Sequence, residues 1–352
     1  MQMKDKLMMM MMTHQRKKKK IQFDFKKMSR RVHAGVVKVL GESPVYESIE
    51  IPAAEEGGDE VEIEVEAVGI HRITRSIANG QHYIKGELPM IVGIDGVGTL
   101  SNGQKVYFVK MKTRFGTMSE YVHVHRDSTI ALPDSVDSIE VAALMNAGIG
   151  SWVALRERAR IQNNETVLIL GVTGTTGQLA AQSARLLGAK RIIGIGRNTS
   201  ILDDLFNRKI IDRSIVFNGN DDEVKEQLND EINEIDIVID YLWGKPAELV
   251  LTTIQSTRTN SVKRLRWIEV GQMAGPTIQL SAALLRSQNI EFSGNGIGPL
   301  SFKQILTSLQ QMIPFIENRQ LTTSIQTFHL KDIEQQWKQT SNIPQRVVVL
   351  IK

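Results

Sequence analysis

The sequence predicts an α/β protein in which a doubly wound parallel sheet accompanies a second, β-rich domain. The first observation is a run of short β-rich segments punctuated by glycine, which extends from Val32 to Val124. The second is that buried strands alternate with helices beyond Ser138, at a spacing of about 25 residues. The third is length, because 352 residues exceed one ordinary core and indicate about two domains.

Composition excludes several classes of protein. With 41% hydrophobic and 23% charged residues, the chain has the composition of a soluble globular protein rather than a disordered one. No apolar run approaches the ~18 residues needed to cross a bilayer, and the methionine run at 8–12 is too short for a signal peptide. The absence of cysteine excludes disulfides, thiolate chemistry and cysteine-ligated metals. We therefore expect a cytoplasmic protein with no membrane segment.

The net charge of +4 is unevenly distributed along the chain. Residues 1–31 hold eleven Lys/Arg and two acids, so this segment carries +9 and residues 32–352 carry −5. Such a low-complexity, Met- and Lys-rich leader predicts a disordered extension, or upstream sequence read before a genuine start at Met28. A tether to nucleic acid or to an anionic surface is the alternative, although like-charge runs are usually just solvated and no nucleic-acid partner is expected.

The β-rich part begins with residues 36–40 and 61–68, and the second of these segments alternates strictly between apolar and polar side chains. Further short segments follow at residues 91–98, 104–109 and 116–124. This spacing of strands suits a small domain that resembles a β-barrel.

Residues 138–160 have a helical pattern, and strand–helix alternation begins after them. The buried strand 166–170 and the amphipathic helix 177–187 open this series. Later strands are expected at residues 191–195, 235–240, 266–271 and 290–294, and helices from about residue 300 precede a last strand at 346–350.

The strongest functional signal is the glycine turn Gly171-Val172-Thr173-Gly174-Thr175-Thr176-Gly177, which follows a buried strand and runs into a helix. Small residues let the backbone approach a pyrophosphate, and the helix N-terminus supplies unpaired N–H groups and the positive end of the helix dipole. Gly177 is expected to let the helix pack closely on the strand, while the hydroxyls of Thr175 and Thr176 are candidate donors to phosphate oxygens. A tight strand–helix turn without a ligand is the structural alternative. The second strand, which begins about fourteen residues on, favours the nucleotide.

The end of the second strand predicts which nucleotide is bound. In NAD sites an Asp or Glu there, about 20 residues past the glycine turn, binds the ribose 2′-hydroxyl. Here the strand ends Gly194-Ile195-Gly196-Arg197-Asn198, and the next acid is Asp203. The Arg197 guanidinium can instead pair with a 2′-phosphate, and the adjacent glycines are expected to leave room for it. We therefore predict NADPH as the cofactor, the alternative being that Arg197 is simply an exposed arginine.

Taken in order, these motifs resemble the medium-chain dehydrogenase/reductase superfamily, specifically its zinc-independent quinone oxidoreductase-like branch. Residues 89–98, 116–122 and 142–152, the glycine turn and Asp240 carry the resemblance, which covers residues 32–352. It implies a GroES-like β-barrel catalytic domain formed by residues 32–150 and 301–352. It implies that residues 151–300 form the inserted Rossmann domain that binds NADP.

The zinc-dependent relatives hold their catalytic metal with a Cys, a His and a third Cys or Asp, at positions that match His71, Ile94 and Asn146. Ile94 cannot ligate a metal, and Asn146 is a poor zinc ligand compared with thiolate or imidazole. The resemblance therefore implies an enzyme without zinc.

Without zinc as a Lewis acid, the resemblance implies hydride transfer to an already electrophilic acceptor, a quinone or an α,β-unsaturated carbonyl. It implies that Tyr83, His71 and Asn146 line the cleft, each as a catalytic hydrogen-bond or proton donor or merely as part of the wall. Residues 71–74 differ from the Asn-Pro and Asp that quinone oxidoreductases commonly carry there. The resemblance also implies contacts to the nicotinamide half of the cofactor from Asp240, Tyr241, Gly271, Gln272 and Asn295.

Two other functions are compatible with the sequence. One is a non-catalytic NADPH-binding sensor or RNA-interacting protein of the same fold, which only the basic leader favours. The other is a zinc alcohol dehydrogenase, which lacks its ligands here. The resemblance further implies a homodimer joined edge to edge near Ile290–Gly294, with a small quinone, enone or enal as the substrate.

Overall fold

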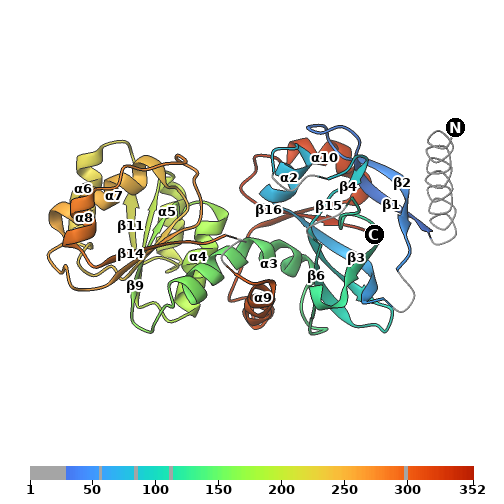
Figure 1. Ribbon diagram of the computed structural model, residues 1–352, viewed down its shortest axis with the longest axis horizontal. Helices are drawn as coiled ribbons and strands as arrows, with labels where there is room; N and C mark the ends of the chain where they lie inside the picture. Colours follow the sequence, from blue (N-terminus) through green and yellow to red (C-terminus); the bar gives the residue numbers. More distant parts are fainter. Residues whose placement is uncertain (1–28, 55–57, 83–85, 111–113, 297–299) are drawn as a thin grey trace, which may run out of the picture. The chain divides into compact units, whose positions relative to one another are not determined.

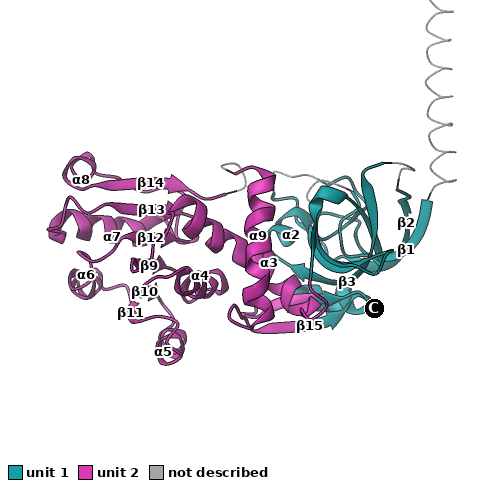
Figure 2. Ribbon diagram, turned by 90° about the horizontal axis from the view of Figure 1, so that it is seen from below, with its two compact units in different colours: residues 1–132, 327–341, 349–352 teal, residues 133–326, 342–348 magenta. Residues whose placement is uncertain are grey.

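The computed structural model describes residues 29–54, 58–82, 86–110, 114–296 and 300–352. It divides into two compact units, which are coloured separately in Figure 2. Unit 1 comprises Met1–Leu132, Thr327–Ser341 and Val349–Lys352, and unit 2 comprises Pro133–Gln326 and Asn342–Val348. The fold is mixed α/β, as the sequence predicts, with antiparallel pairing in unit 1 and an all-parallel sheet in unit 2.

Unit 1 begins with a three-stranded sheet in the order β2 (Val45–Pro52), β1 (Ser29–Val37) and β4 (Met90–Ile91). Strand β1 starts within the segment that we assigned to a disordered leader, so that boundary is wrong for residues 29–31. Arg30 and Arg31 are held by Glu62 at 2.7 Å and Glu50 at 3.5 Å, which neutralises their charge within the sheet. The rest of the leader, residues 1–28, lies outside the described residues.

The larger sheet of unit 1 has the order β15-β16-β3-β5-β6-β8, with β7 paired to β3. Strand β3 is the longest of these, and the buried Ile63, Val65 and Ala67 give its inward face. Two short helices, α2 (Arg72–Ala78) and α10 (Ile333–Gln339), also belong to unit 1. The strand bounds are β3 (Glu60–Ile70), β5 (Asp95–Leu100), β6 (Lys105–Val109), β7 (Tyr121–His125), β8 (Thr129–Ala131), β15 (Ile325–His329) and β16 (Arg346–Leu350).

Unit 2 is built on a six-stranded parallel sheet in the order β11-β10-β9-β12-β13-β14. The first strand, β9, lies in the centre of the sheet. Strands β10 and β11 follow on one side of it and β12, β13 and β14 on the other, which is the doubly wound topology. The strands are β9 (Thr166–Leu170), β10 (Arg191–Gly196), β11 (Arg213–Val216), β12 (Ile237–Asp240), β13 (Leu265–Glu269) and β14 (Ile290–Gly294). The helices between them are α4 (Thr175–Leu186), α5 (Thr199–Asn207), α6 (Asp221–Asn229), α7 (Gly244–Thr257) and α8 (Ala282–Ser287).

Each face of this sheet has its own apolar core, because successive side chains of a strand point to opposite faces. In β9, Val167 and Ile169 belong to one core, while Leu168 and Leu170 belong to the other. All four are fully buried, which explains why the strand is a continuous apolar run rather than an alternating one. Figure 1 shows the helices of this unit on both sides of its sheet.

The boundaries between the units differ from the predicted ones. Helix α3 (Ser138–Val153), its π-helical continuation Ala154–Arg158 and helix α9 (Phe302–Glu317) all belong to unit 2. Helices α3 and α9 pack on each other: a side chain at Gly148 would lie 2.5 Å from the Met312 methyl, and the rings of Trp152 and Phe315 are 5.3 Å apart. The helical segment 138–158 is apolar enough to cross a membrane, but most of it is buried, as in the core helix of a folded domain.

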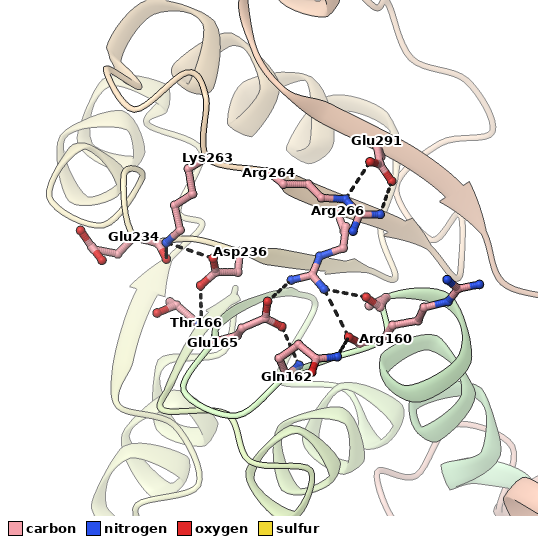
Figure 3. Close-up of polar contacts among 11 residues, drawn as sticks. Arg160, Gln162, Glu165, Thr166, Glu234, Asp236, Lys263, Arg264, Arg266 and Glu291 are labelled. Carbon is pink, nitrogen blue, oxygen red and sulfur yellow. Dashed lines mark hydrogen bonds and ion pairs between the residues drawn. The ribbon is translucent and has the colours of Figure 1, made fainter.

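Ion pairs connect residues at the edge of the unit 2 sheet where the strands begin (Figure 3). Arg266 of β13 is only 7% exposed; it pairs with Glu165 and donates to the Ala159 carbonyl at 2.7 Å. Beside it, Asp236 accepts from the Thr166 backbone N–H at 2.9 Å and pairs with Lys263 at 3.0 Å.

Candidate functional site

The glycine turn lies at the carboxyl end of β9, in the centre of the sheet. Gly171 has a φ of +89°, in the left-handed region that favours glycine. The backbone N–H groups of Gly171 and Val172 both donate to the Ile195 carbonyl, at 2.9 and 3.0 Å. The turn is thereby fixed to the neighbouring strand β10, and helix α4 begins at Thr175.

Gly177 makes the close approach of helix and strand possible. A Cβ at this position would contact the Gly171 carbonyl oxygen and lie 2.7 Å from the Cα of Val172, both of which are backbone atoms. No side chain can be accommodated there unless α4 moves away from β9. The packing reason for Gly177 that the sequence predicts is therefore present in the structure.

The N-terminus of α4 has no side-chain cap. Its N-cap is Gly174, and the first backbone bond of the helix runs from the Gln178 N–H to the Gly174 carbonyl at 2.9 Å. The N–H groups of Thr175, Thr176 and Gly177 precede that bond and have no acceptor within the helix. The next two helices are capped instead, α5 by Asn198 and α6 by Asn220. An uncapped N-terminus after a glycine turn is suited to a phosphate.

The two threonine hydroxyls of the turn differ in what they contact. The Thr175 hydroxyl donates to the Pro344 carbonyl at 3.1 Å, so it serves to hold the chain near the C-terminus rather than being available to a phosphate. Thr176 is exposed. The Thr173 carbonyl accepts from the Gln178 side chain at 3.1 Å, which fixes the orientation of the turn. Of the two predicted hydroxyl donors, only Thr176 is thus placed toward solvent.

The glycines of β10 make room for the glycine turn, a role that was not predicted for them from the sequence. A Cβ at Gly194 would lie 2.7 Å from a methyl of Val172, and a Cβ at Gly196 would meet the Thr173 side chain. Both glycines therefore accommodate the turn itself. The absence of a side chain at Gly194 also explains how the turn accommodates the bulky Val172, which is fully buried there.

Arg197 directly follows β10 and is exposed. In the described part of the chain, no carboxylate forms an ion pair with it, whereas Arg191 at the other end of β10 pairs with Glu231 at 2.6 Å. The Arg197 guanidinium is therefore available at the carboxyl edge of the sheet, one strand away from the uncapped end of α4.

Asp240 is fully buried, and its carboxylate is used by the protein itself. It accepts from the backbone N–H groups of Leu242 at 2.8 Å and Trp243 at 2.9 Å, and from the Trp267 indole at 3.2 Å. Burial raises the pKa of Asp240 to about 6, although the two backbone bonds oppose that rise. The carboxylate thus stabilises the turn after β12, where Trp243 has a φ of +52°.

The other predicted cofactor contacts lie at the ends of β12, β13 and β14. Tyr241 is 9% exposed, and burial raises the pKa of its phenol. A Cβ at Gly271 would lie 3.1 Å from the Tyr241 carbonyl oxygen. The next residue, Gln272, is exposed. Asn295 donates from its side chain to the Gly150 carbonyl at 2.8 Å, so its amide N–H is already used to hold α3. These residues stay predictions as cofactor contacts.

In unit 1, His71 belongs to a buried polar cluster. Its Nε2 lies 2.8 Å from Asp95 Oδ1, and the Tyr107 hydroxyl donates to Asp95 Oδ2 at 2.7 Å. All three side chains are at most 3% exposed, and the Thr117 hydroxyl donates to the Asp95 carbonyl at 2.7 Å. Burial raises the pKa of Tyr107 well above its ordinary value, and the charge of Asp95 raises it further. Asp95 and Tyr107 were not predicted from the sequence; the only signal was an acid flanked by apolar and glycine residues in a buried strand.

The other two predicted catalytic residues, Tyr83 and Asn146, do not belong to the His71 cluster as the structure describes it. Tyr83 lies outside the described residues, and Asn146 lies half-buried on α3 in unit 2. Ile94, at the position that corresponds to a zinc ligand, is 4% exposed and packs in the core. Throughout the described ranges, no group of three His, Asp or Glu side chains is arranged to hold a metal ion.

Sequence comparison finds relatives among oxidoreductases. The chain is 25% identical to the probable NADPH-dependent quinone reductase tdiC of Emericella nidulans over 362 residues, which cover 91% of this chain and 100% of that protein. It is 29% identical to a quinone oxidoreductase of Salmonella typhimurium over 164 residues, 44% of this chain and 50% of that one. No protein-family profile matches the sequence.

Solved structures share the fold over nearly the whole chain. A mycobacterial quinone oxidoreductase superposes with a TM-score of 0.76 at 19% identity, covering 91% of this chain and 100% of its own. The quinone oxidoreductase of Thermus thermophilus, solved also in complex with NADPH, gives a TM-score of 0.70 at 22% identity with the same coverage. At these identities the likeness establishes the architecture of the two units.

Proposed function

We propose that this chain, which has the fold of the medium-chain dehydrogenase/reductase superfamily and sequence relatives among its quinone oxidoreductases, is an NADPH-dependent oxidoreductase that acts without zinc. The acceptor we propose is a quinone or an α,β-unsaturated carbonyl. The single observation that carries the proposal is the glycine turn, in which Gly177 brings the uncapped N-terminus of α4 against β9. The relatives named for quinone reduction supply the reaction class.

The residues at the carboxyl edge of the unit 2 sheet fit a dinucleotide phosphate. The backbone N–H groups of Thr175, Thr176 and Gly177 can hold the pyrophosphate, since none has an acceptor within its helix. Arg197 would pair with the 2′-phosphate, which distinguishes NADPH from NADH. When bound, NADPH supplies a hydride, and the protein has to orient it and exclude water.

The absence of zinc is proposed from the ligand chemistry of the chain. Ile94 offers only an alkyl side chain, and the Nε2 of His71 faces the Asp95 carboxylate. An acceptor that is electrophilic without a metal, such as a quinone or an enone, is compatible with these residues. We propose that His71 stabilises the oxygen of the acceptor and that Asp95 orients the His71 ring.

Steady-state oxidation of NADPH with a panel of quinones, enones and simple ketones tests the reaction. We expect turnover with quinones or enones and none with unactivated ketones, because ketone reduction needs a Lewis or strong general acid. Tight NADPH binding without turnover on any acceptor would instead favour the non-catalytic sensor. Stoichiometric zinc in the purified active protein would contradict the zinc-free part of the proposal.

Arg197→Asp tests the choice of nucleotide. We expect this change to weaken NADPH binding by about 2 kcal/mol, roughly 30-fold, because a charge-assisted contact is replaced by repulsion. NADH binding should change little, and fluorescence titration with both nucleotides measures the difference. Arg208→Asp, the same charge change beyond the end of α5 at an arginine paired with Asp204 at 3.0 Å, is the control. Equal binding of NADPH and NADH to the wild type would overturn the assignment.

We also propose a homodimer joined through β14, because this edge strand pairs only with β13 among the described strands. Sedimentation equilibrium tests it, and a monomer at micromolar concentration would contradict it. The cytoplasm remains the proposed compartment, to be checked by cell fractionation.

A further inference from the structure

Unit 1 contains a pocket of about 380 Å³ whose lining does not include His71, Asp95 or Tyr107. It lies among the end of β2, the start of β3, the end of β6 and the whole of β7. Ile51, Phe115 and Val124 contribute apolar walls, and the polar lining includes Glu60, His123 and Lys110. The volume is in the range of small-molecule sites. Neither the proposed cofactor nor the proposed acceptor needs this pocket.

Lys110 is the chemically distinctive residue of this pocket. It follows β6, its backbone N–H donates to the Ile94 carbonyl at 2.6 Å, and its ammonium donates to the backbone carbonyl of His123. In the part of the chain that the structure describes, no carboxylate forms an ion pair with it. Burial lowers the pKa of the Lys110 amine, and the charge of Glu60 partly opposes that shift.

Other lysines of the protein are held differently. Lys38 pairs with Glu47 at 2.6 Å and is 55% exposed, and Lys352 pairs with Glu64 at 2.5 Å and is 68% exposed. The hydrogen bond and charge of Glu64 raise the pKa of Lys352, opposite to the direction found for Lys110. An ion-paired, solvated ammonium is a poor nucleophile, whereas a desolvated amine is a good one.

The charges around the pocket favour a neutral ligand over an anionic one. Glu62 accepts from Arg30 at 2.7 Å and lies 3.1 Å from the His123 ring, so both of these side chains already have a partner. Glu60 is the carboxylate that lines the pocket. The other ionisable side chains that line it with Lys110 are Tyr121, His123 and His125 from β7. An anion would be repelled by the Glu60 carboxylate, whereas a neutral carbonyl compound would not be.

We propose that Lys110 is a covalent modification site for small aldehydes, which enter this pocket and condense with its ε-amine. The nitrogen lone pair attacks the carbonyl carbon, the C=O π bond breaks, and the carbinolamine loses water to give a protonated imine. Atoms and charge balance, because the ammonium and the aldehyde yield the iminium ion and one water molecule. No oxidant or reductant is required, and the inference does not depend on the proposed reductase activity.

Reductive trapping of the full-length protein with butanal and cyanoborohydride tests this proposal. Peptide mass mapping over a time course gives a rate constant for each lysine in the same sample. We expect Lys110 to react measurably faster than Lys38 and Lys352, since burial of the Lys110 amine favours its neutral, nucleophilic form, whereas the two reference lysines are solvated and ion-paired. A rate for Lys110 equal to or below those of the two reference lysines would overturn the proposal. This comparison uses the wild type alone, so it does not depend on a variant folding.

Two variants add a test of the environment. Glu60→Gln removes the charge that raises the pKa of Lys110, so labelling at Lys110 should shift to lower pH. Glu42→Gln, an exposed glutamate outside the pocket lining, should leave the profile unchanged. Lys110→Arg keeps a positive charge but removes the nucleophile, so it should abolish the rapid phase of adduct formation. An unchanged pH profile in Glu60→Gln, or a rapid phase that persists in Lys110→Arg, would contradict the assignment.

Discussion

Replacing Gly177 with valine is expected to abolish NADPH binding, with at least about a hundredfold loss of affinity, or about 2.7 kcal/mol. The new side chain would meet the Gly171 carbonyl and come within 2.7 Å of the Cα of Val172, so α4 would have to move off the end of β9. That movement displaces the unpaired N–H groups from the phosphate and also costs about 1–3 kcal/mol of stability through overpacking. Fluorescence titration with NADPH and thermal unfolding measure the two effects.

Gly174→Ala is the matched control within the same turn. Gly174 has a φ of −78°, which any residue adopts, and the nearest atom to an added Cβ is the Gly171 oxygen at 3.6 Å. We expect this variant to fold with nearly wild-type stability. If Gly177→Val bound NADPH as the wild type does, the glycine turn would not be the nucleotide site.

Replacing Arg266 with alanine is expected to destabilise unit 2 by about 3–5 kcal/mol, because one partner of a buried ion pair is removed. The Glu165 carboxylate would lose its cation, and the carbonyl of Ala159 would lose its donor. Urea unfolding followed by tryptophan fluorescence is a direct measurement, since Trp267 is a buried neighbour on the same strand.

Arg264→Ala is the control, because Arg264 lies two residues before Arg266 and also forms an ion pair (Figure 3). Arg264 pairs with Glu291 at 2.6 Å, but the two side chains are 56% and 54% exposed. A pair in solvent contributes about 0–1 kcal/mol. Equal losses of stability in the Arg264 and Arg266 variants would contradict the importance that we assign to burial. Replacing Arg266 and Glu165 together by methionine should recover part of the loss, because no unpaired charge remains.

Local patterns in the sequence predicted the glycine turn and several of the strands well. The buried strand 166–170 and the closing strand 346–350 have the predicted bounds, and the glycine turn joins β9 to α4 as expected. The resemblance to the medium-chain dehydrogenase/reductase superfamily is confirmed by the fold and the relatives. Strands β2, β8, β11 and β15 were missed, because short strands with mixed burial carry a weak periodic signal.

Contacts between distant segments explain where prediction failed. The basic residues at 29–31 carry no strand pattern of their own, and only pairing with residues 50–52 of β2 makes them part of a sheet. The compact unit that contains α3 begins at residue 133 instead of the predicted 151, and α3 packs on α9 of the same unit. The Thr175 hydroxyl, a candidate donor to a phosphate, has a partner that the sequence does not reveal, the carbonyl of Pro344, 169 residues away.

The sequence by itself determined the doubly wound sheet, the glycine turn and the arginine that follows the second strand, because these depend on residues within one strand–turn–helix segment. Only the tertiary structure decided that Gly194 and Gly196 make space for Val172 and Thr173, and that Asp240 supports its own turn. It also decided that Asp95, 24 residues from His71, accepts a hydrogen bond from Tyr107 and lies against the His71 ring. Such contacts depend on which side chains the folded chain brings together, and one sequence without its partners in space does not contain that information.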